Sequence, residues 1–197
     1  MDHYKNEPKY HIIRESAHMY DSRPFSGYTI EDYYALSDEQ RVELINGVFY
    51  DMASPTVRHQ SISMKLGTQL ENYVSRKRGK FRVLAGPVDV QLDCDDKTMV
   101  VPDIIIACDP EKVLKDRIMG APDFVAEIVS PSSKRRDYVI KAGKYCEAGV
   151  REYWIIDPDM ERVIVYDFES DAAPIIYSMV DDCLLYTSDA ADDLIGV

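Results

Sequence analysis

The sequence lacks long hydrophobic runs, paired cysteines and a surplus of basic residues, and each absence excludes a class of protein. The aliphatic run at residues 104–106 is far shorter than the roughly 20 apolar residues of a membrane helix, so no membrane partner is expected. The first seven residues, MDHYKNE, have no apolar signal core, which predicts a cytoplasmic location. No CxxC spacing occurs, so neither a zinc site nor a disulfide framework is expected. The scattered cysteines are Cys94, Cys108, Cys146 and Cys183.

The charge balance argues against a broad basic surface. The chain has 23 lysine and arginine residues against 35 aspartate and glutamate residues, a net charge of −12. Proteins that bind nucleic acid through a wide basic face have the opposite balance. A nucleic-acid substrate is still compatible with this charge, because carboxylates that hold a metal ion are acidic themselves and small basic patches can attract phosphate.

The chain divides into three parts. Residues 1–27 carry three histidines whose spacing fits no helical metal pair, which indicates an N-terminal arm or strap. Residues 28–182 form one domain large enough to bury a core. Residues 183–197, CLLYTSDAADDLIGV, resemble the translation of a sequencing-library adapter and are interpreted as a non-native tail. A native acidic tail is the alternative.

The pattern of residues 28–182 predicts an α/β fold, a mixed β-sheet flanked by helices. Asn46-Gly47 between two β-like runs indicates a hairpin. Apolar residues at three- and four-residue steps predict a helix over 56–78, and Gly149 caps a second helix over 137–148. A short helix is expected after Thr29. The other predicted strands are residues 81–84, 88–92, 100–107, 122–131, 152–157, 162–168 and 175–180.

Three acidic residues interrupt apolar strand-like runs: Glu43 in VELI, Asp103 in VVPDIIIA and Glu127 in DFVAEIV. A carboxylate in a buried strand needs a partner, because the burial of an unpaired charge is costly. One explanation is a divalent metal ion held between neighbouring strands. The other is a set of structural ion pairs, and the residues alone leave both open.

The predicted helix at 137–148 carries Asp137, Lys141, Lys144 and Ala148 on one stripe, at steps of four, three and four residues. From the first turns of this helix, a lysine side chain can reach back toward the end of the strand that carries Glu127. The alternative for Lys141 is a surface ion pair with Asp137.

Two basic clusters are the candidate phosphate contacts. The first also suits the negative end of the helix at 56–78, and the second is either solvated or turned toward phosphate. The predicted nucleic-acid-binding residues are Arg76, Lys77, Arg78, Lys80, Lys134, Arg135 and Arg136. His59 is interpreted as a capping or packing residue, and Tyr145 and Trp154 as core aromatics.

Several motifs in order carry a resemblance to a known family. They are ELING at 43–47, VPD at 101–103, PDFVAEIVSPSS at 122–133, RDY at 136–138 and AGVREYWIIDP at 148–158. Together they resemble the Uma-type restriction endonuclease family, which belongs to the PD-(D/E)XK nucleases. The resemblance covers residues 28–180 and implies a restriction-endonuclease-like core.

The resemblance implies a metal-dependent endonuclease that hydrolyses phosphodiester bonds of DNA. Mg²⁺, or Mn²⁺ as a substitute, would be held by Asp103, Glu127 and the backbone carbonyl of Ile128, with Glu43 bound through a water. A lysine is also needed near the attacking water, but Val129 stands where the family motif has it. Lys141 is the expected replacement, with Lys144 and Lys134 as further candidates.

The alternative function is a nuclease-fold module without turnover, which serves nucleic-acid or protein interaction. Val129 and the net charge of −12 favour it. A homodimer is expected for the enzyme, because cutting both strands of DNA requires two active sites.

Overall fold

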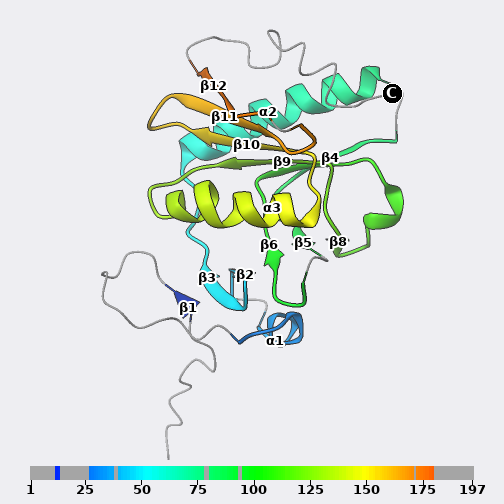
Figure 1. Ribbon diagram of the computed structural model, residues 1–197, viewed down its shortest axis with the longest axis vertical. Coiled ribbons are helices and arrows are strands. Elements are labelled where there is room, and N and C mark those ends of the chain that lie inside the picture. Colours follow the sequence, from blue (N-terminus) through cyan, green and yellow to red (C-terminus); the bar gives the residue numbers. More distant parts are fainter. Residues whose placement is uncertain are drawn as a thin grey trace, which may run out of the picture.

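The computed structural model describes residues 12–13, 27–37, 40–77, 80–92, 95–170 and 172–179. Most of the predicted arm, the predicted tail at 183–197 and Arg78 lie outside these residues. Over the described part of the chain the fold is α/β, as predicted, but the strands form two mixed sheets instead of one (Figure 1).

The first sheet is built from short strands. Its order is β1 (Ile12–Ile13), β3 (Val48–Asp51), β2 (Val42–Ile45), β6 (Met99–Val100), β5 (Asp89–Gln91) and β8 (Arg117–Met119). The predicted hairpin joins β2 to β3, and its turn residues Asn46 and Gly47 have φ of 53° and 74°. Two successive positive φ angles match the right-handed twist of the strands, which is why Asn-Gly is favoured there. The hairpin brings Glu43 into the middle of β2.

The second sheet forms the larger core. Its order is β12 (Ile175–Ser178), β11 (Arg162–Asp167), β10 (Glu152–Asp157), β9 (Phe124–Ile128), β7 (Ile104–Ala107) and β4 (Arg82–Ala85). The central strand β9 runs parallel to β10 and antiparallel to β7. Strands β7, β9 and β10 are buried throughout, as strands covered on both faces are expected to be.

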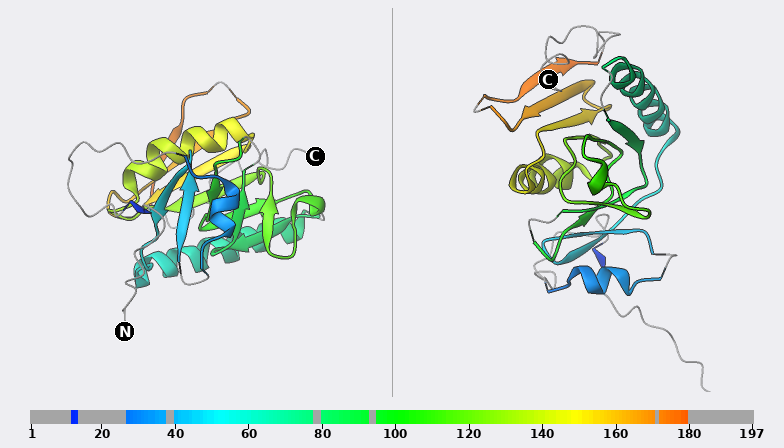
Figure 2. Two further views of the ribbon diagram at one scale, coloured as in Figure 1. Left: turned by 90° about the horizontal axis from the view of Figure 1, so that it is seen from below. Right: turned by 90° about the vertical axis from the view of Figure 1, so that its right-hand side faces the viewer.

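Helices cover both faces of this second sheet (Figure 2). Helix α2 (Val57–Arg76) buries Leu66, Leu70 and Val74 against one face, which includes Phe124 and Trp154. On the opposite face lie α3 (Ala142–Ala148), with Tyr145, and the first sheet. The far face of the first sheet is covered by α1 (Ile30–Tyr34), the short helix expected after Thr29. No helix of the described residues has both the length and the apolar character to span a bilayer.

The predicted strand over 100–107 is wrong in one respect, because it breaks at Val101–Asp103. Pro102 has no N–H to donate to a sheet, and the N–H of Val101 donates to Glu43 Oε1 at 3.0 Å instead of to a neighbouring strand. The chain leaves the first sheet at β6 and enters the second at β7. Asp103 therefore lies where the two sheets meet.

The predicted helix over 137–148 also differs in its first half. Residues Arg136–Lys141 form wide π-helical turns, and regular α-helix begins at Ala142. Hydrogen bonds in a π-helix reach five residues along the chain, so its turns are wider and residues five apart lie nearer the same side than in an α-helix. Arg136 and Lys141 are therefore on the same side of the helix. The predicted C-cap is confirmed, since Gly149 has φ of +90°. Residues Pro110–Lys112 form a single 3₁₀ turn, and β8 was not predicted.

Candidate active site

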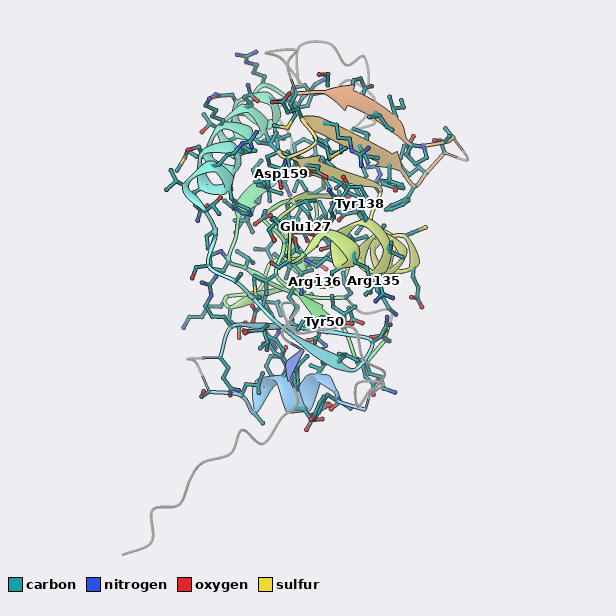
Figure 3. All side chains as sticks on the ribbon, turned by 90° about the vertical axis from the view of Figure 1, so that its left-hand side faces the viewer. Tyr50, Glu127, Arg135, Arg136, Tyr138 and Asp159 are labelled. Atoms are coloured by element: carbon teal, nitrogen blue, oxygen red, sulfur yellow. The ribbon has the colours of Figure 1, made fainter. Side chains whose placement is uncertain are left out.

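All four predicted catalytic residues line a single pocket at the junction of the two sheets. Glu43 comes from β2, Asp103 from the segment before β7, Glu127 from β9 and Lys141 from the π-helical turns. The cavity has a volume of about 420 Å³. Glu127 and Arg136 are labelled among the side chains in Figure 3. Residues far apart in the chain thus meet where the resemblance placed a nuclease site.

Lys141 joins the two buried glutamates. Its Nζ lies 2.6 Å from Glu43 Oε1 and 2.8 Å from Glu127 Oε1. It also lies 3.6 Å from Asp137 Oδ1, so the i, i+4 pair exists, but it is buried instead of on the surface. The side chain of Lys141 is only 3% exposed. A buried ammonium of this kind is stable only when carboxylates surround it.

Two further side chains hold these glutamates in place. Arg136 Nε lies 3.2 Å from Glu43 Oε2, and the Tyr145 hydroxyl donates to Glu127 Oε1 at 2.7 Å. Arg136 is 6% exposed, so the solvated alternative is wrong for it, whereas its predicted contact with phosphate stays a prediction. Tyr145 is a core aromatic, as predicted, and its hydroxyl also reaches the site from behind β9.

Asp103 is held through a single oxygen. Its Oδ2 accepts the backbone N–H of Ile128 at 2.7 Å and lies 3.1 Å from His59 Nε2. Because a carboxylate only accepts, His59 Nε2 is the donor. The hydrogen bond to Asp103 raises the pKa of His59 above its ordinary value.

The sequence-based interpretation of His59 as a capping or packing residue missed this contact. His59 lies at the start of α2, where its backbone N–H donates to the side chain of the N-cap Thr56 at 3.2 Å. The contact with Asp103 joins residues 44 positions apart in the chain, and no local pattern indicates it.

The buried part of the site holds more acidic than basic groups. Glu43, Glu127 and Asp137 surround Lys141 and Arg136, so three carboxylates face two cations. Burial raises the pKa of Glu127, and the nearby Lys141 only partly opposes that shift. Burial alone would lower the pKa of Lys141, but the carboxylates of Glu127, Glu43 and Asp137 raise it above its ordinary value. The site therefore favours a positive charge beyond those that Lys141 and Arg136 supply.

The donor groups suit a hard divalent cation. Asp103 Oδ1 and Glu127 Oε2 have no hydrogen-bond partner among the residues that the structure describes, and both residues line the pocket. No three His, Cys, Asp or Glu side chains of the described residues gather closely enough to form a metal cluster on their own. Mg²⁺ needs no such cluster, because it is usually bound by one or two carboxylates and completes its shell with water and substrate oxygens.

The other candidate lysines lie elsewhere. Lys144 Nζ pairs with Asp95 at 2.7 Å and with Glu147 at 2.8 Å. Lys134 Nζ pairs with the buried Asp157 at 3.0 Å. Neither is among the residues that line the pocket, so Lys141 is the lysine of this site.

The basic residues separate into two groups. Arg76 and Lys77 are at the far end of α2, which at 1.5 Å per residue is roughly 25 Å from His59, and Lys80 follows them. Lys134 and Arg135 are exposed at the start of the π-helical turns, near the pocket. Two further arginines that the sequence reasoning missed, Arg41 and Arg58, line the pocket itself. A phosphate-binding role for the predicted residues stays a prediction.

Known proteins resemble this chain in sequence and in fold. A curated protein of Synechocystis sp. (strain PCC 6803), named "Uncharacterized protein slr1290", is 26% identical over 126 residues. The match covers 63% of this chain, and the chain spans 63% of the length of that relative. A crystal structure from Anabaena variabilis, titled a putative nuclease belonging to DUF820, has a similar fold with a TM-score of 0.64 and 20% identity. The match covers 76% of this chain and 84% of the Anabaena chain.

A family assignment rests on a longer match. The profile of the Uma2 family, described as "Putative restriction endonuclease", matches residues 30–179. These residues include the four predicted catalytic residues, which are Glu43, Asp103, Glu127 and Lys141. The fold and the matched residues thus agree with the resemblance seen in the motifs, and the chain belongs to the Uma2 family.

Proposed function

We propose that the chain is a metal-dependent endonuclease that hydrolyses phosphodiester bonds of DNA, with Mg²⁺ as the native ion and Mn²⁺ as a substitute. One observation carries the proposal: the ammonium of Lys141 lies 2.8 Å from Glu127 and 2.6 Å from Glu43 in the pocket that Asp103 also lines. A helix thus supplies the lysine that position 129 of the strand lacks.

Asp103, Glu127 and the backbone carbonyl of Ile128 would hold the ion, and Glu43 would contact it through a water. A bound Mg²⁺ would lower the pKa of a coordinated water and offset the negative charge that develops on the phosphate. Lys141 then positions the attacking water and stabilises the transition state. Glu43 orients Lys141 and is itself held by Arg136 at 3.2 Å.

The charges around the pocket favour a polyanionic substrate. Arg41 and Arg58 line the pocket, while Lys134 and Arg135 are exposed beside it. Arg58 Nη2 donates to the carbonyl of Pro158 at 2.7 Å and still has 57% of its side chain exposed. These cations could contact phosphates on either side of the scissile bond, although the whole chain carries a net charge of −12.

The test is nicking of supercoiled plasmid with Mg²⁺ or Mn²⁺ by the native chain and by Asp103→Ala, Glu127→Gln and Lys141→Met. Each variant should lower the rate roughly 100-fold or more, the usual effect of removing a group that stabilises the transition state. Lys144→Met is the matched control, since Lys144 lies on the same helical segment and pairs outside the pocket.

Lys141→Met also removes the cation that two buried glutamates share, which costs roughly 3–5 kcal/mol of stability. Its rate is therefore measured at a temperature at which circular dichroism shows the variant folded. Nicking that survives the combined Asp103→Ala and Glu127→Gln substitutions would overturn the enzyme. It would leave the second candidate, a nuclease-fold module without turnover, which Val129 and the acidic net charge favour.

A further inference from the structure

The orientation of Asp103 depends on contacts to one of its two oxygens. Oδ2 accepts from the N–H of Ile128 at 2.7 Å and from His59 Nε2 at 3.1 Å. Oδ1 has no hydrogen-bond partner among the described residues. The Ile128 contact comes from the backbone of β9 and is present with any side chain, so His59 is the only side chain of the described residues that fixes this carboxylate.

His59 is itself held at a fixed place. Its backbone N–H donates to the Thr56 side chain at 3.2 Å, and the next helical residue on its N-terminal side, Arg58, binds the Pro158 carbonyl at 2.7 Å. The helix then packs Leu66 and Leu70 against the second sheet. The imidazole therefore reaches Asp103 from a rigid element.

Asp103 is the strongest partner of the imidazole, and the backbone of Ile128 also favours its charged form. His59 Nδ1 is buried and has no partner within the described part of the chain. The contact with the N-cap Thr56 uses only the backbone N–H of residue 59, and any residue other than proline could provide it. The side chain is used for Asp103.

We propose that His59 is a positioning residue of the nuclease site: its hydrogen bond fixes Asp103 through Oδ2, so that Oδ1 is the oxygen presented to the metal ion. The proposal rests on the proposed metal-dependent function. Partners that orient a metal ligand typically change metal affinity 10- to 100-fold when they are removed.

Mn²⁺ binding to the full chain without DNA, measured by isothermal titration calorimetry, tests the role. His59→Ala should raise the Mn²⁺ dissociation constant about 10-fold or more. His59→Gln should return it to within about threefold, because Gln Nε2 lies the same number of bonds from Cα as His Nε2 and donates in the same direction. Gln69→Ala, an exposed change on the same helix, is the control.

Nicking supplies a second readout. With His59→Ala, the Mn²⁺ concentration needed for half-maximal nicking should rise, while the rate at saturating Mn²⁺ should change much less. Melting temperatures of the Ala and Gln variants separate loss of folding from loss of positioning.

The outcomes distinguish this inference from the function on which it rests. If the native chain binds Mn²⁺ and Asp103→Ala abolishes binding, but His59→Ala binds as the native chain does, the positioning role is wrong and the metal site stands. Failure of Gln to restore the affinity lost in folded His59→Ala would also overturn the role. If the native chain binds no Mn²⁺, both proposals fall.

Discussion

Lys141 is the proposed substitute for a lysine at position 129. That position follows β9 and holds a buried valine, whereas Lys141 comes from the helical segment that follows. The resemblance called for a lysine near Glu127, and the helix that follows β9 pointed to Lys141, whose Nζ lies 2.8 Å from Glu127 Oε1. Sequence spacing could not find His59, whose contact with Asp103 depends on how α2 packs across the sheet.

Glu152 is a buried carboxylate far from this chemistry, at the start of β10. It is 8% exposed and accepts the indole N–H of Trp154. Burial raises the pKa of Glu152 from 4.5 to about 7, although the hydrogen bond from Trp154 opposes the shift. The folded chain therefore binds a proton more tightly than the unfolded chain between pH 4.5 and pH 7.

The free energy of unfolding is therefore highest when Glu152 is protonated in both states. It falls as the pH rises from 4.5 through about 7. Glu152→Gln removes the buried charge and keeps an acceptor for Trp154. We expect it to raise the free energy of unfolding by roughly 1–3 kcal/mol at pH 8 and to change it little at pH 4. Urea unfolding at the two pH values measures this. The exposed Glu111→Gln is the control, and an equal gain at both pH values would contradict the prediction.

At the scale of elements, the π-helical turns explain how two cations reach one carboxylate. Arg136 and Lys141 are five residues apart and contact the two oxygens of Glu43. The sequence predicted a helix here from its apolar spacing and its terminal glycine, but nothing in it distinguished five-residue from four-residue hydrogen bonding. The wide turn occurs together with ion pairs to Glu43, which lies about 95 positions away from this helix in the chain and is therefore invisible to local spacing.

The other differences in the elements have similar causes. Asn46-Gly47 is a local signal that needs no tertiary information, and the hairpin was predicted correctly. The run over 100–107 looks like one strand because aliphatic residues stand on both sides of Pro102 and Asp103, yet Val101 donates to a side chain 58 positions away. Strand β8 has only three residues, Arg117–Met119, which is too short for a periodic pattern.

The two glycines of the α3 region should respond in opposite ways to alanine. At both positions a Cβ would meet no atom within 4 Å, so only backbone conformation decides the effect. Gly143 lies inside the helix, where alanine is favoured by about 0.5–1 kcal/mol. Gly149 has φ of +90°, where alanine costs about 1–2 kcal/mol. Thermal unfolding should show Gly143→Ala melting higher and Gly149→Ala melting lower than the native chain, and the same sign for both would contradict this.

At the scale of the whole molecule, the described residues provide one set of the four site side chains per chain. In the proposed endonuclease one set would cleave one strand at a time, so cleavage of both strands in a single binding event would need two chains, which is the basis for the expected homodimer.

Plasmid cleavage as a function of protein concentration checks this expectation. At concentrations where light scattering shows a monomer, open circles should accumulate before linear DNA. At concentrations where it shows a dimer, linear DNA should form without that lag. A lag that stays the same while the chain passes from monomer to dimer would mean that the pair does not act as one unit.

The junction of the two sheets also bears on local unfolding of the molecule. Glu43 belongs to the first sheet and Glu127 to the second, and Lys141 is within 2.8 Å of both. The distance between the two glutamates therefore reports how the two sheets pack against each other. A ligand that contacts both carboxylates would connect the two sheets at the same place as Lys141. Its binding should then slow amide hydrogen exchange throughout both sheets, and not only in the strands that line the pocket.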